Sequence, residues 1–483
     1  MALTGSPYIL FLVTVVLLAA ALQRRMVPAL MLVASLLFYA WGDLTKLPIL
    51  VFIILCAYFG GIDLGKTDDK GKTRTKGKTR DKGKTRDKGK TRERSRLWLW
   101  LAVTFLPLLL FKYYGVLGFG KLSGGLLPAT LFPPLGISFY TFQATAYLID
   151  VYRRDASPEK SLARVALFLS FFPLVLAGPI ERAGHLMPQL RLFEGSWKKE
   201  SDLVGGCYLI LKGLLIKLVF ADNFAGFVDK VYAGLATESP ANAVMASYLY
   251  SAQIYCDFYG YTLIALGSAA LFGIRLVNNF EHPYFALSIQ QFWQRWHISL
   301  STWLRDYVYF SLGGLRKPVN RYRNTFITML VCGVWHGAGL QFLLWGALHG
   351  LALMLNRLFQ NATAGILPRI RPALRPLSAL LTFQFVTLAW VLFRADSLSV
   401  AWTMIRKITS AVQAPGVLDQ PSWVFYARLG CAFVLFEVLD YWIDLEALFR
   451  RCPAPLKAAW IVAIYCALYF APLKGMRFVY FQF

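Results

Sequence analysis

Two histidines lie in stretches of the sequence that could carry out proton transfer. His336 follows the apolar run 326–334 and Trp335, and it precedes the glycine-containing segment 337–339. Burial favours the neutral form of an imidazole, which can accept a proton. Such a base could deprotonate a hydroxyl group that attacks a thioester, and the glycines would let backbone and substrate approach closely. The alternative for His336 is a packing histidine at a helix end.

The second histidine, His297, lies in the segment 293–307, which we predict to be one amphipathic helix. On a helical wheel, Gln294, His297, Ser301 and Arg305 share a narrow polar face that could line an internal funnel. A hydrogen-bonded core histidine is the alternative for His297. The opposite, apolar arc holds Trp293, Trp296, Leu300, Trp303, Leu304 and Tyr307.

A polar face also recurs in the apolar run 241–274. Gln253, Asp257 and Tyr261 are spaced four residues apart, so they would lie on one side of a helix. We expect Asp257 either to pair with a basic side chain in the interior or to line a substrate path. His349 lies between small residues and is expected to be structural. The two remaining histidines, His185 and His282, lie in polar turns and are expected to be solvated or capping.

The motifs of covalent catalysis are absent from the sequence. There is no G-x-S-x-G motif, and no Cys–His pairing suggests a protein nucleophile. The seven cysteines are scattered without a C-x-x-C pair, so we infer neither a zinc site nor a disulfide framework. The sequence therefore predicts direct transfer between two bound substrates, without a metal or cofactor.

The elements that must position these residues are membrane helices. The chain is 57% hydrophobic and 16% charged, with a mean hydropathy of +0.50, whereas soluble domains carry about 25% charged residues. Recurrent apolar runs of about 15 to 20 residues indicate a polytopic all-α membrane protein. Ionisable side chains at membrane depth are costly and usually face the protein interior or a water-filled cavity. The histidines, arginines and aspartate between residues 275 and 349 are therefore candidates for function.

We expect about 10 to 12 transmembrane and re-entrant helices. The segment 131–154, broken by Pro133, Pro134 and Gly136, is predicted to be kinked or re-entrant. We divide the chain into N-terminal helices (1–64), a basic loop (65–96), further helices (97–274), a catalytic core (275–356) and C-terminal helices (357–483). The apolar runs lie at 7–22, 26–41, 47–64, 97–119, 162–178, 203–220, 241–274, 340–358, 376–393, 424–442 and 458–470.

The segment 65–96 is a basic hexapeptide repeat. It contains nine Lys and six Arg against four Asp and one Glu, a net charge of +10 within the chain's +25. It has no apolar residue to bury, so it should be disordered. No apolar strand precedes its GKT triplets and no aromatic residues interleave, which argues against nucleotide and nucleic-acid binding. We expect a cytoplasmic loop near anionic lipid headgroups. The first apolar run lacks a cleavage site and is expected to remain as an anchor.

An ordered set of motifs resembles the membrane-bound O-acyltransferase family. The similarity is greatest to the alginate O-acetyltransferase branch, which includes cellulose-acetylating relatives, and the branch that transfers D-alanine to teichoic acid is a near cousin. The motifs are LGISFYTFQATAYLIDVYR (135–153), FFPLVLAGPIERAGHLMPQL (171–190), YCDFYGYTLIALGSAALFGI (255–274), NNFEHPY (278–284), FWQRWHISLSTWLRDYVYFSLGG (292–314), GVWHGAG (333–339) and FVYFQF (478–483).

This resemblance implies a fold and a reaction. It implies a ring of tilted helices around a central tunnel, with His336 as the catalytic histidine and His297 as the second important one. Acetyl-CoA or another acyl donor would enter from the cytoplasm, and a periplasmic acceptor protein would bind from the other side. The basic repeat at 65–96 is longer than the corresponding loop of the relatives.

We therefore predict an inner-membrane O-acetyltransferase that serves the acetylation of a secreted exopolysaccharide, alginate-like or cellulose. Its partners would be acetyl-CoA, the periplasmic acceptor protein, membrane lipids and a polysaccharide synthesis complex, and no nucleic acid. His336 would be the general base. The remaining site residues would contact substrate or support it: His297 and Arg305 on the donor path, Asp257 and Asn279 in the polar interior, Trp293, Trp296 and Trp303 bracing the amphipathic helix, and Ser301 and Trp335 beside them.

Three other functions stay open at this point. One is transfer of D-alanyl or another acyl group to a cell-envelope polymer. A second is a transporter or flippase, which would often show two matching halves with interrupted helices; no such internal repeat is evident. A third is a scaffold for a polysaccharide synthase.

Overall fold

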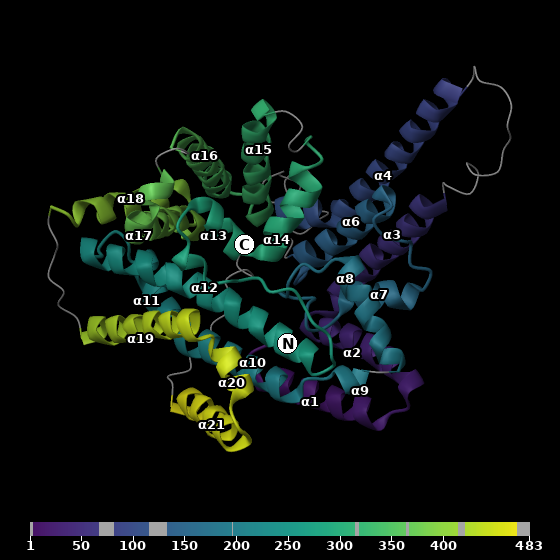
Figure 1. Ribbon diagram of the computed structural model, residues 1–483, viewed down its shortest axis with the longest axis horizontal. Helices are drawn as coiled ribbons and strands as arrows, with labels where there is room; N and C mark the ends of the chain where they lie inside the picture. The colour runs from purple at the N-terminus through teal and green to yellow at the C-terminus, as the bar shows by residue number, and fades with distance from the viewer. Residues whose placement is uncertain are drawn as a thin grey trace, which may run out of the picture. The chain divides into compact units, whose positions relative to one another are not determined.

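The computed structural model describes residues 3–66, 82–114, 133–195, 197–313, 318–363, 367–413 and 421–470. All regular elements within these ranges are helical (Figure 1). The chain forms two compact units. Unit 1 comprises Met1–Leu203 with Ser268–Val277, and unit 2 comprises Val204–Gly267 with Asn278–Phe483.

Unit 1 holds the helices of the N-terminal part of the chain. They are α1 (Ser6–Ala21), η1 (Arg24–Met26), α2 (Val27–Gly42), η2 (Leu44–Lys46), α3 (Leu47–Gly65), α4 (Lys82–Tyr113), α6 (Ile137–Arg153), α7 (Leu162–Ser170), α8 (Ala183–Leu190), η4 (Arg191–Glu194) and α9 (Trp197–Glu200).

Unit 2 holds the remaining helices, with the last turn of α12 in unit 1. They are α10 (Leu203–Leu214), η5 (Leu215–Ala221), α11 (Asp222–Ala233), α12 (Pro240–Ala270), η6 (Pro283–Phe285), α13 (Ile289–Arg295), α14 (Ile298–Trp303), η7 (Leu304–Tyr309), α15 (Pro318–His336), α16 (Leu340–Ala362), α17 (Leu367–Arg394), α18 (Leu398–Ser410), α19 (Pro421–Ile443), α20 (Leu445–Arg451) and α21 (Ala454–Phe470). Two of these, η5 and η7, are π-helices.

The prediction of an all-α, multi-pass membrane protein is confirmed. Within the described ranges, six helices are long and apolar enough to cross a membrane, and Ser6–Ala21 and Ala454–Tyr469 are shorter apolar helices. The apolar runs at 241–274 and 424–442 are helical as well, as α12 and α19. The six long helices are Arg24–Gly42, Leu44–Gly65, Thr91–Tyr113, Leu203–Ala233, Leu340–Ala362 and Ala373–Arg394.

Two predictions about the N-terminal half are wrong in part. Residues 82–96 of the basic repeat are not disordered but form the first turns of α4, and residues 67–81 lie outside the described residues. The apolar run 162–178 is not one helix. Its helical part, α7, ends at Ser170 and is followed by turns whose N–H groups at Leu174, Val175 and Gly178 bond back to residues 171 and 174.

The start of α6 explains why the segment 131–154 is broken at Gly136. Gly136 has a φ of 73° at the helix N-cap, a conformation that favours glycine. A Cβ atom at this position would collide with the carbonyl oxygen of Val175. The α6 helix that follows is mostly buried, while residues 131 and 132 lie outside the described part of the segment.

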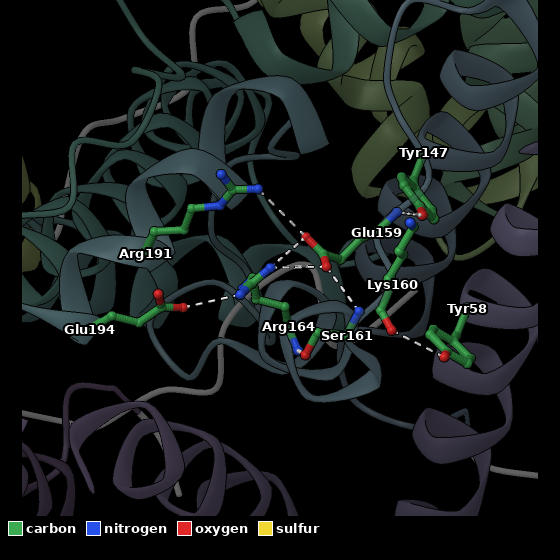
Figure 2. Close-up of polar contacts among 8 residues, drawn as sticks. All are labelled: Tyr58, Tyr147, Glu159, Lys160, Ser161, Arg164, Arg191 and Glu194. Carbon is green, nitrogen blue, oxygen red and sulfur yellow. Dashed lines mark hydrogen bonds and ion pairs between the residues drawn. The ribbon is translucent and has the colours of Figure 1, made fainter. Parts of the chain in front are cut away.

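The loop between α6 and α7 is fixed by a polar cluster around Glu159, shown in Figure 2. The Glu159 carboxylate accepts a hydrogen bond from the N–H of Ser161 at 2.9 Å. Both of its oxygens lie 3.0 Å from the same guanidinium nitrogen of Arg164, which donates to them. Arg191 approaches the same carboxylate at 4.0 Å, and the Glu159 N–H donates to the Tyr147 hydroxyl at 2.8 Å. The Glu159 carboxylate thus ties the loop to α7 and η4, and the Glu159 backbone N–H ties it to α6.

In unit 2, the α10–η5 segment packs against α12 through glycines. A Cβ atom on Gly213 would lie 2.6 Å from the carbonyl oxygen of Gly260, and one on Gly267 would lie 2.5 Å from that of Gly206. Any residue other than glycine at positions 213 and 267 would therefore push the two helix backbones apart. Small residues of this kind allow close helix packing in membranes, where the hydrophobic effect does not hold helices together.

The α15 and α16 helices form a second tightly packed pair, side by side in Figure 1. A Cβ atom on Gly333 would collide with the carbonyl oxygen of Phe342, and one on Gly346 with that of Met329. The short connection between these helices carries the segment 337–339 that follows His336.

Candidate active site

His336 is the last residue of α15 and its side chain faces inward. Only 4% of the residue is exposed. Its imidazole packs edge-to-face against Trp335, Trp345 and Phe393, with ring centroids 4.7, 5.2 and 5.0 Å away. The three aromatic rings keep water from these sides of the imidazole. The environment therefore has the dry character expected of a neutral base.

His297 lies between α13 and α14, so the prediction of one continuous helix over 293–307 is wrong. The α13 helix ends at Arg295, and His297 takes a left-handed conformation (φ 43°, ψ 54°) before α14 begins. The chain continues into the π-helix η7 at Leu304. Because of the break, the helical wheel that grouped Gln294 with His297 and Ser301 does not describe this segment.

The break is produced by a neighbouring stretch of chain. The N–H of Ile298 donates to the carbonyl oxygen of Asn279 at 3.0 Å, and the N–H of Glu281 donates to that of Arg295 at 3.0 Å. These bonds pair residues 279–281 with the turn around His297. Sequence periodicity alone carries no signal for such a pairing.

The two histidines share one tryptophan. The Trp335 ring lies 6.0 Å from His297 and 4.7 Å from His336, centroid to centroid. His297 is fully buried, an environment that favours the neutral form of an imidazole. The structure thus places the two predicted histidines around the same indole, and Trp335 is the residue that connects them.

A second aromatic contact chain runs from His336 to Trp293. Trp345 packs against His336 at 5.2 Å, against His349 at 4.7 Å and against Trp293 at 5.8 Å. The indole N–H of Trp293 donates to Nδ1 of His349 at 3.3 Å. His349 is fully buried, which agrees with the structural role expected for it. Its hydrogen bond holds Trp293 in place.

Next to Trp293 lies a cavity of about 330 Å³. Three of the predicted site residues line it, namely Trp293, Ser301 and Arg305, and Arg357 of α16 adds a second guanidinium. The rest of its wall is largely apolar: Leu304, Tyr309, Phe310, Thr325, Thr328, Met329 and Leu353. The side chain of Arg305 is 57% exposed and pairs with Asp306 at 2.8 Å. The cavity thus combines a largely apolar wall with two cationic groups.

The other predicted site residues have structural contacts. Trp296 is buried against Trp390 (5.0 Å) and Phe280 (5.1 Å), and Trp303 packs on Tyr307 at 5.2 Å. These tryptophans therefore brace the α13–α14 turn and η7 rather than one amphipathic helix. Asn279 is fully buried and accepts the N–H of Ser299 on its side-chain oxygen at 3.2 Å.

Asp257 forms the ion pair that its position on α12 predicts. Its carboxylate lies 2.5 Å from the ammonium of Lys217, which is also 2.5 Å from Asp222. Lys217 lies in the π-helix η5 and approaches the Tyr261 ring at 5.9 Å. The prediction that Asp257 pairs with a base is thus confirmed. Its role toward a substrate stays a prediction.

A further buried polar group went unrecognised in the sequence. Lys212 pairs with Asp440 of α19 at 2.7 Å, and Glu437 accepts the Tyr255 hydroxyl at 3.2 Å. The signal that could have revealed them was the presence of two acidic residues, Glu437 and Asp440, one turn apart in the apolar run 424–442.

The two turn histidines are both paired. His185 is 43% exposed and contacts Glu181 at 2.6 Å, and that hydrogen bond raises its pKa. His282, at the N-terminus of η6, lies 3.3 Å from Glu437. Among the described side chains, no cluster of His, Cys, Asp and Glu could hold a metal ion.

Comparison with known families gives one extended match. The model of the membrane-bound O-acyltransferase family, MBOAT, matches residues 99–395. This span includes both histidines of the candidate site, the cavity and the ion pair of Asp257.

Three relatives illustrate the range of this similarity. The probable alginate O-acetylase AlgI of Pseudomonas aeruginosa is 36% identical over 392 residues, which cover 79% of this chain and 69% of that protein. The peptidoglycan O-acetyltransferase of Helicobacter pylori is 35% identical over 430 residues, covering 80% and 75%. The teichoic acid D-alanyltransferase of Bacillus subtilis is 29% identical over 279 residues, covering 55% and 70%.

Proposed function

Since this chain belongs to the membrane-bound O-acyltransferase family and is an O-acyltransferase, we propose that it moves an acetyl group from acetyl-CoA to a hydroxyl acceptor. The acceptor lies on the path to O-acetylation of a secreted polysaccharide, alginate-like or cellulose. The names of relatives at 35–36% identity, probable alginate O-acetylase and peptidoglycan O-acetyltransferase, support acetylation of a polysaccharide. The cellulose alternative rests on the motif resemblance alone.

The observation that carries the proposal is the cavity beside Trp293. Its volume, about 330 Å³, is at the lower end of the roughly 300–1,000 Å³ typical of ligand pockets. This size suits a narrow acyl-carrying arm better than a whole nucleotide. Arg305 and Arg357 supply positive charge for phosphate groups, which guanidinium groups bind well.

The length of the donor arm fits the position of the cavity along α15. Thr325 and Thr328 line the cavity, and at 1.5 Å per residue they lie about 12–16 Å along the helix from His336. The pantetheine arm of coenzyme A has roughly thirteen bonds from phosphate to sulfur, or roughly 15 Å when extended. A phosphate held by the two arginines would therefore let the thioester reach the level of His336. Trp293 lines the cavity, and Trp345 contacts both Trp293 and His336. The donor arm would therefore run alongside these two indole rings.

In the proposed reaction, His336 accepts the proton of the acceptor hydroxyl as its oxygen attacks the thioester carbonyl carbon. The carbon–sulfur bond breaks, coenzyme A leaves as the thiolate, and the proton held by His336 neutralises it. General base catalysis of this kind contributes about 10²–10⁴-fold to a rate. His297 and Arg305 line the donor path, and no metal or additional cofactor takes part.

We further propose the cellular setting of the reaction. The chain lies in the bacterial inner membrane with its basic 65–96 repeat on the cytoplasmic side, in keeping with the positive-inside rule. Acetyl-CoA then enters from the cytoplasm, and a periplasmic acceptor protein and a polysaccharide synthesis complex take up the product. Membrane lipids surround the helices.

The experiment is transfer of radiolabel from acetyl-CoA in membranes that contain the chain. Label should appear covalently on a protein or polysaccharide acceptor, and His336→Ala with native helicity should lower this rate at least about 100-fold. Transfer at the wild-type rate by that variant would refute the assignment. Transport of an intact solute would favour a transporter, and acetylation that survives both His336→Ala and His297→Ala would favour a scaffold. Label from D-alanyl thioester in place of acetyl-CoA would indicate the D-alanyl reaction.

A further inference from the structure

We propose that Asn279 is a positioning residue that fixes the imidazole of His297 for the transfer reaction. This inference rests on the proposed function, because it gives His297 a part in that reaction. It assigns to Asn279 a task at the turn between α13 and α14, in addition to the polar lining expected from the sequence.

The backbone of His297 needs outside support. Its φ of 43° lies in the left-handed region, which residues other than glycine rarely adopt. His297 stands at the N-cap position of α14, where a side chain would ordinarily accept a free N–H of the first turn. The His297 side chain makes no such bond.

Asn279 takes over this capping from a separate segment. Its carbonyl oxygen accepts the N–H of Ile298 at 3.0 Å, and its side-chain Oδ1 accepts the N–H of Ser299 at 3.2 Å. The two N–H groups that follow His297 are thus both bonded to one residue. The first turn of α14 is therefore capped by Asn279 and not by the imidazole of His297.

The surrounding contacts fix the same turn. Phe280, the next residue, packs on Trp296 at 5.1 Å, and Phe258 packs on both Phe280 (5.1 Å) and His297 (4.7 Å). Because Asn279 is fully buried, water cannot replace its side-chain oxygen if that oxygen is removed. The N–H of Ser299 would then be buried without an acceptor, and the turn would shift to satisfy it.

The test is a double-mutant cycle on acetyl-CoA turnover in reconstituted membranes, with an alginate oligosaccharide as the hydroxyl probe. Asn279→Leu, which removes the acceptor, should lower kcat about 10- to 100-fold while the KM for acetyl-CoA changes less than about twofold. Asn279→Asp keeps the acceptor oxygen, and because the site is fully buried its carboxyl group should be held in the neutral form. It should therefore retain more of kcat than Asn279→Leu. In the His297→Ala background, Asn279→Leu should have less than about a twofold further effect, because the two residues act as one unit.

Matched variants keep the test decisive. Asn361→Leu changes an exposed asparagine of α16, whose side chain donates to the Tyr322 hydroxyl at 3.4 Å, and it should leave kcat unchanged. If Asn279→Leu does not fold, Asn279→Ser, whose shorter side chain cannot reach the Ser299 N–H, takes its place.

The inference is overturned if Asn279→Leu leaves kcat unchanged, or if its loss multiplies in full with that of His297→Ala. In either case the wild-type enzyme would still turn over acetyl-CoA, and the proposed function would stand. Absence of turnover by the wild-type chain would instead contradict the proposed function itself.

Discussion

The ion triad of Lys217, Asp222 and Asp257 allows a prediction that separates structure from substrate binding. Lys217 bridges both carboxylates at 2.5 Å, and all three side chains are buried. Replacing the cation and replacing one carboxylate therefore have unequal consequences. Lys217→Met leaves two carboxylates facing each other, whereas Asp257→Asn leaves Lys217 paired with Asp222.

The magnitudes follow from this geometry. Removing one partner of a buried ion pair destabilises a protein by about 3–5 kcal/mol, because the other charge stays buried without compensation. We expect this loss of unfolding free energy for Lys217→Met. The amide of Asp257→Asn can still accept a hydrogen bond from Lys217, so its loss should be about 1 kcal/mol, the size of one ordinary hydrogen bond.

The assay is a denaturant titration of the purified protein in mixed micelles, followed by helical circular dichroism, together with acetyl-CoA turnover at a temperature where every variant is folded. Lys230→Met, which removes an exposed lysine from the same helical segment, serves as the control and should change stability little. Equal losses for Lys217→Met and Asp257→Asn would refute the ion-triad reasoning. A large change of KM in folded Asp257→Asn would show that Asp257 contacts a substrate.

Three further predictions concern single contacts. Trp293→Phe keeps the aromatic ring but removes the N–H that donates to His349 at 3.3 Å. It should lower the free energy of unfolding by about 1–3 kcal/mol and raise the KM for acetyl-CoA several-fold in a steady-state assay. An unchanged KM would show that Trp293 does not line the donor path. Gly136→Ala should destabilise unit 1 by about 3 kcal/mol or more, because of its φ of 73° and the collision with Val175; Gly184→Ala, with open space around it, is the control in the same thermal-unfolding measurement. Burial would raise the pKa of Glu159, but hydrogen bonds from Ser161 and Arg164 outweigh it, so the pKa lies below its ordinary value of 4.5. The stabilisation by the ionised carboxylate is therefore present above pH 4.5 and is lost as the pH falls through the lowered pKa. Glu159→Gln should abolish this loss of stability at acidic pH in a series of unfolding midpoints measured against pH.

Much of the fold and part of the site could be predicted from the sequence. Apolar length is a local property, so the helical spans 47–64 and 340–358 agree closely with α3 and α16. The contact of His336 with Trp335 could be predicted for a similar reason, since the two are chain neighbours, whereas its contact with Phe393 joins residues 57 positions apart. The catalytic role of His336 stays a prediction. The base that pairs with Asp257 could be expected as a type but not as Lys217, because the pairing joins two distant helices.

Two of the failures share one physical cause, which is contact between distant segments. A helical wheel assumes a continuous helix, and the pairing of residues 279–281 with the turn at His297 ends that continuity. Likewise, the run 162–178 is apolar throughout, yet its second half forms turns. There the N–H of Phe172 donates to the hydroxyl of Ser35 in α2 at 3.2 Å, a contact that periodicity does not reveal. The cavity depends on Arg357, a residue of α16 that lies over 50 positions beyond Arg305 in the chain.

The glycine contacts between α10 and α12 have a mechanical consequence. Two helices whose backbones are in contact have no flexible side chains between them that could adapt to a relative displacement. The α10 and α12 helices should therefore move together as a rigid body. A conformational change of unit 2 that admits or releases a bulky molecule then has to involve displacement of its other helices. A disulfide or other crosslink that joins α10 to α12 should consequently leave the turnover rate unchanged.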